Sequence, residues 1–202
     1  MNAEKKISMV ILAGGASSRM GQDKSDLLLD GKTFLEIQIK KGRMLGIEDI
    51  LISGYHGKKE LPKNVRLIRD RFPGKGPLGG LEACLREAKF PQCLVLGIDV
   101  PLVPVEELKM LIEKAVEEIR GKEKTSAVIL EHHGREEPLM GVYDCKLADK
   151  MLEEIIQYKG SVFAFLRRNG YQCVQSQKPQ ECFMNVNDPE AYCRLKKEIC
   201  GN

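Results

Sequence analysis

The sequence contains no tryptophan, and only 5% of its 202 residues are aromatic. Proteins that bind single-stranded nucleic acid use aromatic side chains as stacking platforms and carry a strongly basic surface. Here the net charge is only +3. We therefore expect no nucleic-acid partner, and the charge suits at most a local basic patch for phosphate groups.

A long hydrophobic run is also missing. The apolar stretch nearest the N-terminus, Ile7–Leu12, runs straight into Ala13, Gly14 and Gly15. A membrane-spanning helix needs about 20 apolar residues. We expect neither a signal peptide nor a membrane span.

Cysteine pairs with metal-binding spacing are absent as well. The sequence has seven cysteines and no Cys-x-x-Cys pair. His132 and His133 are adjacent and lack ligand spacing to any cysteine pair. An odd number of unpaired cysteines is typical of reduced thiols, so we expect a cytoplasmic protein without a zinc site.

Short apolar runs alternate with amphipathic stretches along the chain. Their nearly continuous hydrophobicity is typical of strands buried on both faces of a sheet. The runs are Ile7–Leu12, Ile50–Ile52, Val65–Ile68, Cys93–Ile98, Ala127–Leu130 and Leu139–Tyr143. Strands alternating with helices predict an α/β fold, here a three-layer α/β/α, Rossmann-like, doubly wound sheet that is mostly parallel. We expect one domain over residues 1–202.

Capping signals delimit the predicted helices. Thr33 and Glu36 have the spacing of a capping box, which predicts a helix to about Leu45. Asp188 followed by Pro189 is typical of an N-cap and a first helical position. The other predicted helices are Leu81–Lys89, residues 104–121, Lys146–Gln157 and Ser161–Arg168.

Residues 12–24 have the outline of a phosphate-binding loop. Gly14 and Gly15 lack a Cβ, so their backbone amides can approach an anion closely. Arg19 and Lys24 add full positive charge to the same segment. The spacing is not that of a Walker A loop. The alternative is a glycine turn flanked by ordinary surface cations.

Two aspartates follow predicted strands. Asp99 comes after Cys93–Ile98, and Pro101 stiffens the turn behind it. In doubly wound sheets ligands bind at the carboxyl ends of strands, and Mg²⁺ accepts one or two carboxylates supplemented by phosphates and water. Asp70 follows Val65–Ile68. The alternatives are a turn-forming role for Asp99 and a solvated ion pair for Asp70.

Residues 74–79 match the G-x-G-x-x-G pattern of dinucleotide-binding enzymes. That pattern normally follows a first strand directly, whereas Arg71-Phe72-Pro73 intervenes here and Pro77 stiffens the turn. A nicotinamide-dependent dehydrogenase is therefore disfavoured. We interpret residues 76–80 as a loop that forms a second wall of the ligand site.

Five motifs occur together in one order along the chain. They are Leu-Ala-Gly-Gly-x-x-x-Arg-Met-Gly-x-x-Lys at 12–24, Gly-Pro-Leu-Gly-Gly at 76–80, Asp-Val-Pro at 99–101, Glu-Pro-Leu at 137–139 and Phe-Met-Asn-Val-Asn-Asp-Pro-Glu at 183–190. Together they closely resemble the molybdenum cofactor guanylyltransferases of the nucleotidyltransferase superfamily. The resemblance covers about residues 7–195. The first motif is shared by the whole superfamily, whereas the last motif accompanies its guanylyltransferase members.

The resemblance implies transfer of GMP from GTP to the terminal phosphate of molybdopterin, with pyrophosphate released and Mg²⁺ as cofactor. It implies that Arg19, Lys24 and Asp99 are catalytic and that Asp99 binds the metal. Asn185 and Asn187 would face the pterin, although helix capping and turn formation are the alternative for both. The residues implied in nucleotide binding are Leu12, Ala13, Gly14, Gly15, Lys24, Ser53, Asp70, Gly79 and Asp99. Ser53 stands where relatives often carry asparagine, and its hydroxyl can still hydrogen-bond.

Two other functions stay open at this point. One is a cytidylyltransferase acting on the same pterin or on a sugar-alcohol phosphate, whose relatives tend to have Leu-Ala-Ala-Gly in the first loop. The other is a nucleotide-binding regulator without turnover, which the presence of both Lys24 and Asp99 disfavours. Molybdoenzymes and other cofactor-biosynthesis proteins are candidate protein partners.

Overall fold

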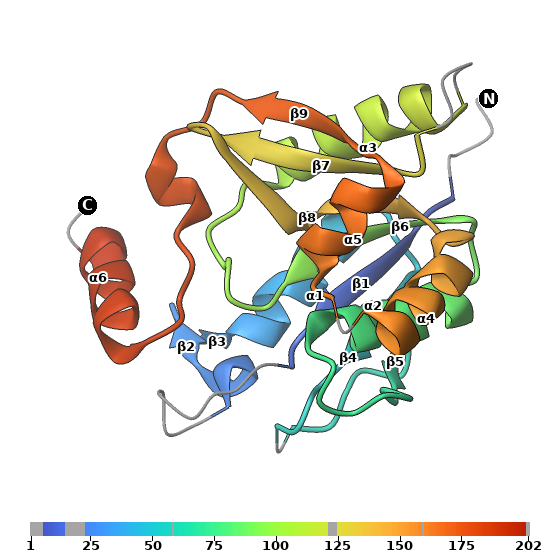
Figure 1. Cartoon of the computed structure of the whole chain (residues 1–202). Coiled ribbons are helices and arrows are strands. Elements are labelled where there is room, and N and C mark those ends of the chain that lie inside the picture. The colour runs from blue at the N-terminus through green and yellow to red at the C-terminus, as the bar shows by residue number, and fades with distance from the viewer. Residues whose placement is uncertain (1–5, 15–22, 58, 121–124, 159, 201–202) are drawn as a thin grey trace.

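The computed structural model describes residues 6–14, 23–57, 59–120, 125–158 and 160–200 (Figure 1). Its centre is a seven-stranded sheet with the order β5-β4-β1-β6-β8-β7-β9. The strands are β1 (Ser8–Leu12), β4 (Asp49–Ser53), β5 (Val65–Ile68), β6 (Gln92–Gly97), β7 (Ala127–His132), β8 (Arg135–Asp144) and β9 (Gln172–Ser176). In this sheet β8 is antiparallel to both its neighbours, and the remaining strand pairs are parallel. The predicted, mostly parallel sheet is confirmed.

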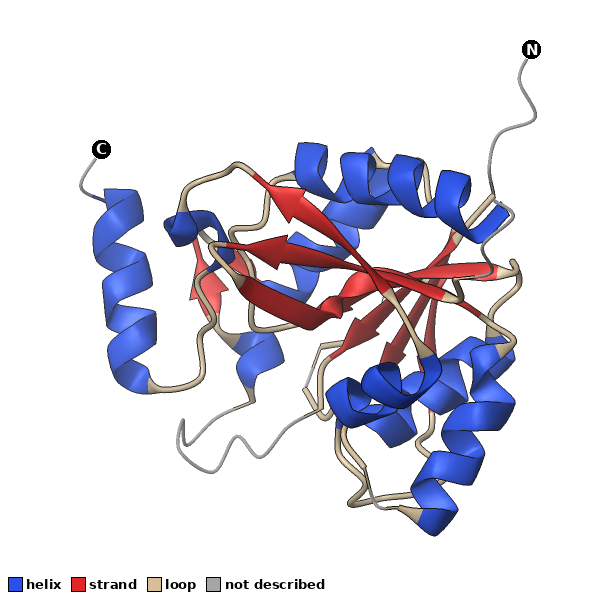
Figure 2. Cartoon of the chain, turned by 45° about the horizontal axis from the view of Figure 1, so that its top comes forward, coloured by secondary structure: helices blue, strands red, loops and turns tan. Residues whose placement is uncertain are grey.

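Helices cover both faces of the sheet (Figure 2). One hydrophobic cluster joins a face of the sheet to α1 (Phe34–Met44), α3 (Val105–Arg120) and α6 (Pro189–Cys200). A second cluster joins the other face to α2 (Pro77–Glu87), α4 (Leu147–Gln157) and α5 (Val162–Asn169). The three-layer α/β/α arrangement is therefore confirmed. None of the helices described combines the length and the apolar character needed to cross a membrane.

The predicted caps of α1 and α6 are both formed. Thr33 Oγ1 accepts a hydrogen bond from Glu36 N at 3.1 Å, and the Glu36 carboxylate accepts one from Thr33 N at 2.7 Å. Asp188 Oδ1 accepts a bond from Ala191 N at 2.8 Å. Helix α3 ends at Arg120, and its predicted stop, Gly121, lies outside the described residues.

The prediction of a loop over residues 76–80 is wrong. Helix α2 begins at Pro77, so Gly79 and Gly80 belong to its first turn. Proline is favoured at a first helical position because its missing N–H needs no partner there. Because these two glycines have no Cβ, the first turn of the helix packs closely against Asp70 and Ser53.

Two further parts of the fold have no strong signal in the sequence. Strand β9 reads Gln-Cys-Val-Gln-Ser and contains no apolar run, because it lies at the edge of the sheet and is only partly buried. A small hairpin, β2 (Leu28–Leu29) and β3 (Lys32–Thr33), precedes α1. Tyr192 of α6 donates a hydrogen bond to Leu28 O at 2.6 Å, which ties the C-terminal helix to this hairpin.

The cysteine side chains that the structure describes are free thiols: Cys84, Cys93, Cys145, Cys173, Cys182 and Cys193. The Sγ atoms of Cys93 and Cys145 lie 3.6 Å apart, whereas a disulfide bond is about 2.05 Å long. The reduced state of the thiols that the sequence predicts stays a prediction.

Candidate active site

The carboxyl ends of β1, β4 and β6 lie side by side. Leu12, at the end of β1, is in register with Ser53 of β4 on one side and with Gly97 of β6 on the other. The chain leaves β1 in one direction to form β4 and β5, and later places β6 on the opposite side of β1. Such a reversal of strand order is where open α/β sheets bind ligands. The predicted site residues Leu12 and Ser53 end β1 and β4 at this edge, and Asp99 follows β6 here.

The segment after β1 touches the segment after β4 through two glycines. A Cβ on Gly14 would lie 3.1 Å from Gly54 Cα, and a Cβ on Gly54 would lie only 2.3 Å from Gly14 Cα. Gly54 also has a φ of 74°, a conformation that favours glycine. The contact explains why Gly14 lacks a side chain. Gly54 was not among the predicted site residues.

The side chains of Leu12 and Ala13 are buried, so the ligand edge sees mainly their backbone. Ala13 N donates to Ser53 O at 2.8 Å, and Ile98 N donates to Leu12 O at 3.0 Å. These bonds extend the sheet just past its regular strands. Gly15 and Arg19, both predicted site residues, lie outside the described residues.

Ser53 is buried, with 3% of its surface exposed. Its hydroxyl packs against Gly80 of α2, where an added Cβ would lie 2.5 Å from Ser53 Oγ. The side chain is therefore directed at the helix, and the role of Ser53 in nucleotide binding stays a prediction.

Asp70 and Gly79 meet at the N-terminal turn of α2. Asp70 Oδ1 accepts a hydrogen bond from Phe72 N at 2.7 Å. A Cβ on Gly79 would lie 2.9 Å from the same oxygen. A carboxylate is favourable beside a helix N-terminus because the helix dipole is positive there. The two predicted residues are thus brought together.

Lys24, Asp99, Asn185 and Asn187 form one cluster, although they come from three distant parts of the chain. Lys24, in the short helix η2 (Lys24–Asp26), donates a hydrogen bond to Asn187 Oδ1. Its Nζ also lies 3.9 Å from Asp99 Oδ2. The Asn185 side chain lies near the Asp99 carboxylate and favours its ionised form, and Val186 N donates to Asp99 O at 2.8 Å. The structure thus brings these four predicted site residues together, and their roles stay predictions.

Burial dominates the electrostatics of Asp99. It raises the pKa of this carboxyl above its usual range, and the nearby Lys24 ammonium and Asn185 amide offset only part of that increase. The carboxylate rests against Gly97, where an added Cβ would lie 2.6 Å from Asp99 Oδ1. The site thus has a carboxylate that would gain from a further positive partner.

A cavity of about 310 Å³ opens beside Asp99 and Asn185. Pairing of β8 with β6 stops at Met140, and the preceding residues of β8 extend past the end of β6 and form one wall. Phe163 of α5 lines another part. The cavity therefore lies between the carboxyl edge of the sheet and the C-terminal segment.

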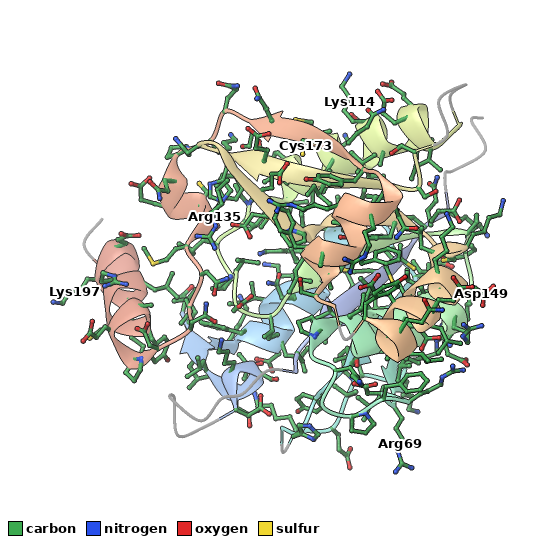
Figure 3. The ribbon with its side chains drawn as sticks, viewed as in Figure 1. Arg69, Lys114, Arg135, Asp149, Cys173 and Lys197 are labelled. Atoms are coloured by element: carbon green, nitrogen blue, oxygen red, sulfur yellow. The ribbon has the colours of Figure 1, made fainter. Side chains whose placement is uncertain are left out.

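The cavity wall contains charged residues that the sequence did not single out as site residues. Arg135 Nε lies 2.8 Å from Glu137 Oε1, and His132 Nε2 lies 3.2 Å from the same oxygen. The His132 ring stacks on Phe183 with centroids 4.3 Å apart, just before the segment containing Asn185. Figure 3 shows Arg135 at this end of the sheet, toward the segment that leads to α6. The signal in the sequence that could have pointed to this wall is the run of three charged residues, Arg135, Glu136 and Glu137, at the start of β8.

Comparisons with known proteins agree with this arrangement. Residues 9–173 match the family model of the MobA-like NTP transferase domain. A protein of Carboxydothermus hydrogenoformans named "Probable molybdenum cofactor guanylyltransferase" is 31% identical over 199 residues, covering 96% of each chain. The crystal structure of molybdopterin-guanine dinucleotide biosynthesis protein A from Archaeoglobus fulgidus is 25% identical, with a TM-score of 0.71, and the match covers 96% of this chain and 99% of that one.

A more distant structure shares the fold. It is the 4-diphosphocytidyl-2C-methyl-D-erythritol synthase of Anaerococcus prevotii, which is 13% identical with a TM-score of 0.74 over 97% of this chain and 96% of that one. At this identity the likeness concerns the architecture and not the substrate.

Proposed function

The chain belongs to the family of MobA-like NTP transferases, and from this premise we propose that it transfers GMP from GTP to the terminal phosphate of molybdopterin. Pyrophosphate is released, and the product is the guanine dinucleotide form of the cofactor. The observation that carries the proposal is the cluster of Lys24, Asp99, Asn185 and Asn187 at the strand-order reversal, next to the cavity.

In the proposed reaction an oxygen of the acceptor phosphate attacks the α-phosphorus of GTP. A new P–O bond forms, and the bond from the α-phosphorus to the oxygen of the departing pyrophosphate breaks. Lys24 neutralises negative charge on the triphosphate, with Arg19 and the backbone amides of Gly14 and Gly15 proposed to assist. The acceptor phosphate is already ionised, so the chain needs no protein nucleophile or strong base.

Asp99 is the residue we propose to hold Mg²⁺. Its carboxylate lines the cavity and its pKa is raised by burial, so a divalent cation would favour the ionised form. Among the described residues no three His, Cys, Asp or Glu side chains converge on one point. A single carboxylate still suits Mg²⁺, because phosphates and water complete its ligands. When bound, the ion would neutralise charge on the reacting phosphates.

The cavity beside Asp99 is the proposed acceptor site. Asn185 Oδ1 is buried without a hydrogen-bond partner among the described residues, so a donor on the pterin would satisfy it. Arg135 brings a positive charge to the same cavity and can pair with the acceptor phosphate. Phe163 adds an apolar surface for a flat ring system.

Pyrophosphate release is the experiment that tests the proposal. The purified protein is incubated with molybdopterin, Mg²⁺ and each of GTP, CTP and ATP in turn. We expect release with GTP well above the other two. Equal rates with CTP would move the assignment to a cytidylyltransferase, and a sugar-alcohol phosphate in place of molybdopterin tests the second acceptor of that alternative.

The Asp99→Asn variant separates an enzyme from a nucleotide-binding regulator. We expect this variant to lose nearly all pyrophosphate release while it retains metal-free GTP binding, because the carboxylate is needed for the metal and not for the base. Asp149→Asn is the matched control, since Asp149 is an exposed residue of α4 that does not line the cavity. Figure 3 shows it on the opposite side of the molecule from Arg135, which does. We propose that the reaction takes place in the cytoplasm, in keeping with the free thiols.

A further inference from the structure

Two buried side chains of α1 lie beneath the loop that carries Asp99. Gln38 and Lys41 are three residues apart, so they share one face of the helix. Gln38 Nε2 donates to Gly97 O at 3.0 Å and to Val100 O at 3.2 Å. Lys41 Nζ donates to Pro101 O at 2.8 Å and lies 3.4 Å from Val100 O. All these acceptors are backbone carbonyls on either side of Asp99.

Packing alone does not explain a lysine at this position. Lys41 is only 6% exposed, and no carboxylate pairs with its ammonium in the part of the chain that the structure describes. Burial of an unpaired ammonium costs on the order of several kcal/mol, even after the protein around it relaxes. An unbranched apolar side chain would fill the same space without this cost. The amine and the amide are therefore present for the carbonyl oxygens that they bind.

The loop between β6 and α3 has few other anchors near Asp99. Val186 N donates to Asp99 O, and Ile98 N continues the sheet by bonding Leu12 O. Gly97 permits the carboxylate to fold back over the strand end. The carbonyls of Gly97, Val100 and Pro101 are held toward α1 while the Asp99 side chain lines the cavity. Helix α1 is thus a mechanical support for the Asp99 loop.

We infer that Gln38 and Lys41 are positioning residues that fix the Asp99 carboxylate in the cavity through their bonds to the flanking carbonyls. Neither residue touches the cavity, so neither is a catalytic residue. The mechanical part of the inference stands on the contacts of α1. Its consequence for nucleotide transfer rests on the proposed function.

Amide hydrogen exchange tests the mechanical part without any substrate. Lys41→Met and Gln38→Met each remove the donors of one side chain and keep an unbranched stem. We expect the Val186 amide, which bonds Asp99 O, to exchange about tenfold faster or more in both variants, since about 1.4 kcal/mol corresponds to a factor of ten. Lys40→Met is the matched control, because Lys40 is exposed on the same helix. Its exchange should equal that of the wild type.

Metal binding and turnover test the consequence. Electron paramagnetic resonance measures Mn²⁺ binding in the presence of GTP, and pyrophosphate release gives kcat. We expect both variants to bind Mn²⁺ several-fold more weakly and to lose about 10- to 100-fold in kcat, because a displacement of about 1 Å can cost 100-fold in rate. Metal-free GTP affinity should stay within about twofold, a split that general damage to the fold would not produce.

The outcomes separate the two proposals. Wild-type exchange at Val186 in a folded Lys41→Met and a folded Gln38→Met variant would overturn the positioning role. Equal losses of metal binding and of metal-free GTP binding would also overturn it. Should Lys41→Met not fold, Gln38→Met removes two of the contacts without touching the amine and decides alone. A wild-type protein without guanylyl transfer would refute the proposed function, and the exchange measurement would still decide the positioning role.

Discussion

Lys24 connects the two halves of the candidate site. Its ammonium contacts Asn187 on the C-terminal segment and lies near Asp99 on the loop after β6. We predict that Lys24→Ala weakens GTP binding by about tenfold or more, because a charge-assisted contact to phosphate is worth about 1.5–3 kcal/mol. Isothermal titration with GTP measures the effect.

The control for this prediction is Lys197→Ala on α6. Figure 3 shows Lys197 on the outer side of the molecule, and it is exposed. Its removal changes the net charge by the same amount without entering the site, so GTP affinity should be unchanged. Full GTP affinity in Lys24→Ala would identify Lys24 as an ordinary surface cation.

Asn185 allows a separate prediction on the acceptor side. Its side chain lines the cavity beside Asp99, and its Oδ1 is buried without a hydrogen-bond partner among the described residues. Asn185→Ala should raise the KM for molybdopterin at least tenfold, whereas GTP affinity should change little, because alanine offers neither donor nor acceptor. Steady-state kinetics with either substrate varied will separate the two effects. Normal acceptor kinetics with a lowered melting temperature would assign Asn185 to the fold.

The sequence predicts some residues of the candidate site and misses others. Lys24, Asp99, Asn185 and Asn187 are polar residues in recognisable motifs, and the structure brings them together. Gly54 has no such signal, because its role depends on how closely two strand ends approach. Gln38 and Lys41 look like ordinary residues of an amphipathic helix, and their carbonyl partners lie some 60 residues away.

At the scale of elements, the start of α6 corrects one sequence-based alternative. Asn187 was a candidate helix cap, but the cap bond comes from Asp188. We predict that Asp188→Ala lowers the free energy of unfolding by about 1 kcal/mol. Asn187→Ala should leave the helix intact and instead weaken GTP binding, since it removes a partner of Lys24. Urea denaturation and GTP titration of both variants check this, and a larger stability loss in Asn187→Ala would contradict it.

Strand β5 lies at an edge of the sheet and is only partly buried, yet the predicted run Val65–Ile68 matches its bounds. Most of the other predicted strands are buried on both faces. Val10, Leu51 and Val95 lie in such strands, and each is fully buried. Strand β9 lies at the edge, where one side of the strand lacks a neighbour and polar residues are tolerated. The sequence does not predict the start of α2, because Gly79 and Gly80 disfavour a helix locally. Close packing of the helix against Asp70 and Ser53 nevertheless requires glycine at both positions.

At the scale of the whole molecule, one continuous sheet carries both hydrophobic clusters. The expectation of a single domain over residues 1–202 stays a prediction, supported by a family model that spans residues 9–173. The site is assembled from the segments after β1, β4 and β6 and from the segment before α6. Sequence motifs predict which residues take part, whereas only the topology determines that the C-terminal asparagines reach Lys24 near the N-terminus.

Lys41 should make the stability of the whole molecule depend on pH. Burial lowers the pKa of Lys41 from 10.5 to about 7. Between pH 7 and 10.5 the unfolded chain therefore holds a proton that the folded protein does not, so stability rises with pH in this range. Below pH 7 both states are protonated, and the full cost of burying the charge is present.

We therefore predict that Lys41→Met is more stable than the wild type at pH 6 and that this advantage shrinks as the pH rises to 9. The change should not exceed about 1.4 kcal/mol per pH unit. Urea denaturation of both proteins at pH 6, 7, 8 and 9 measures it, and other titrating groups cancel in the difference. Lys40→Met should differ from the wild type by a constant amount, because Lys40 is exposed. A pH-independent difference for Lys41→Met would mean that Lys41 stays charged in the folded protein throughout this range, held by the carbonyl oxygens of the Asp99 loop.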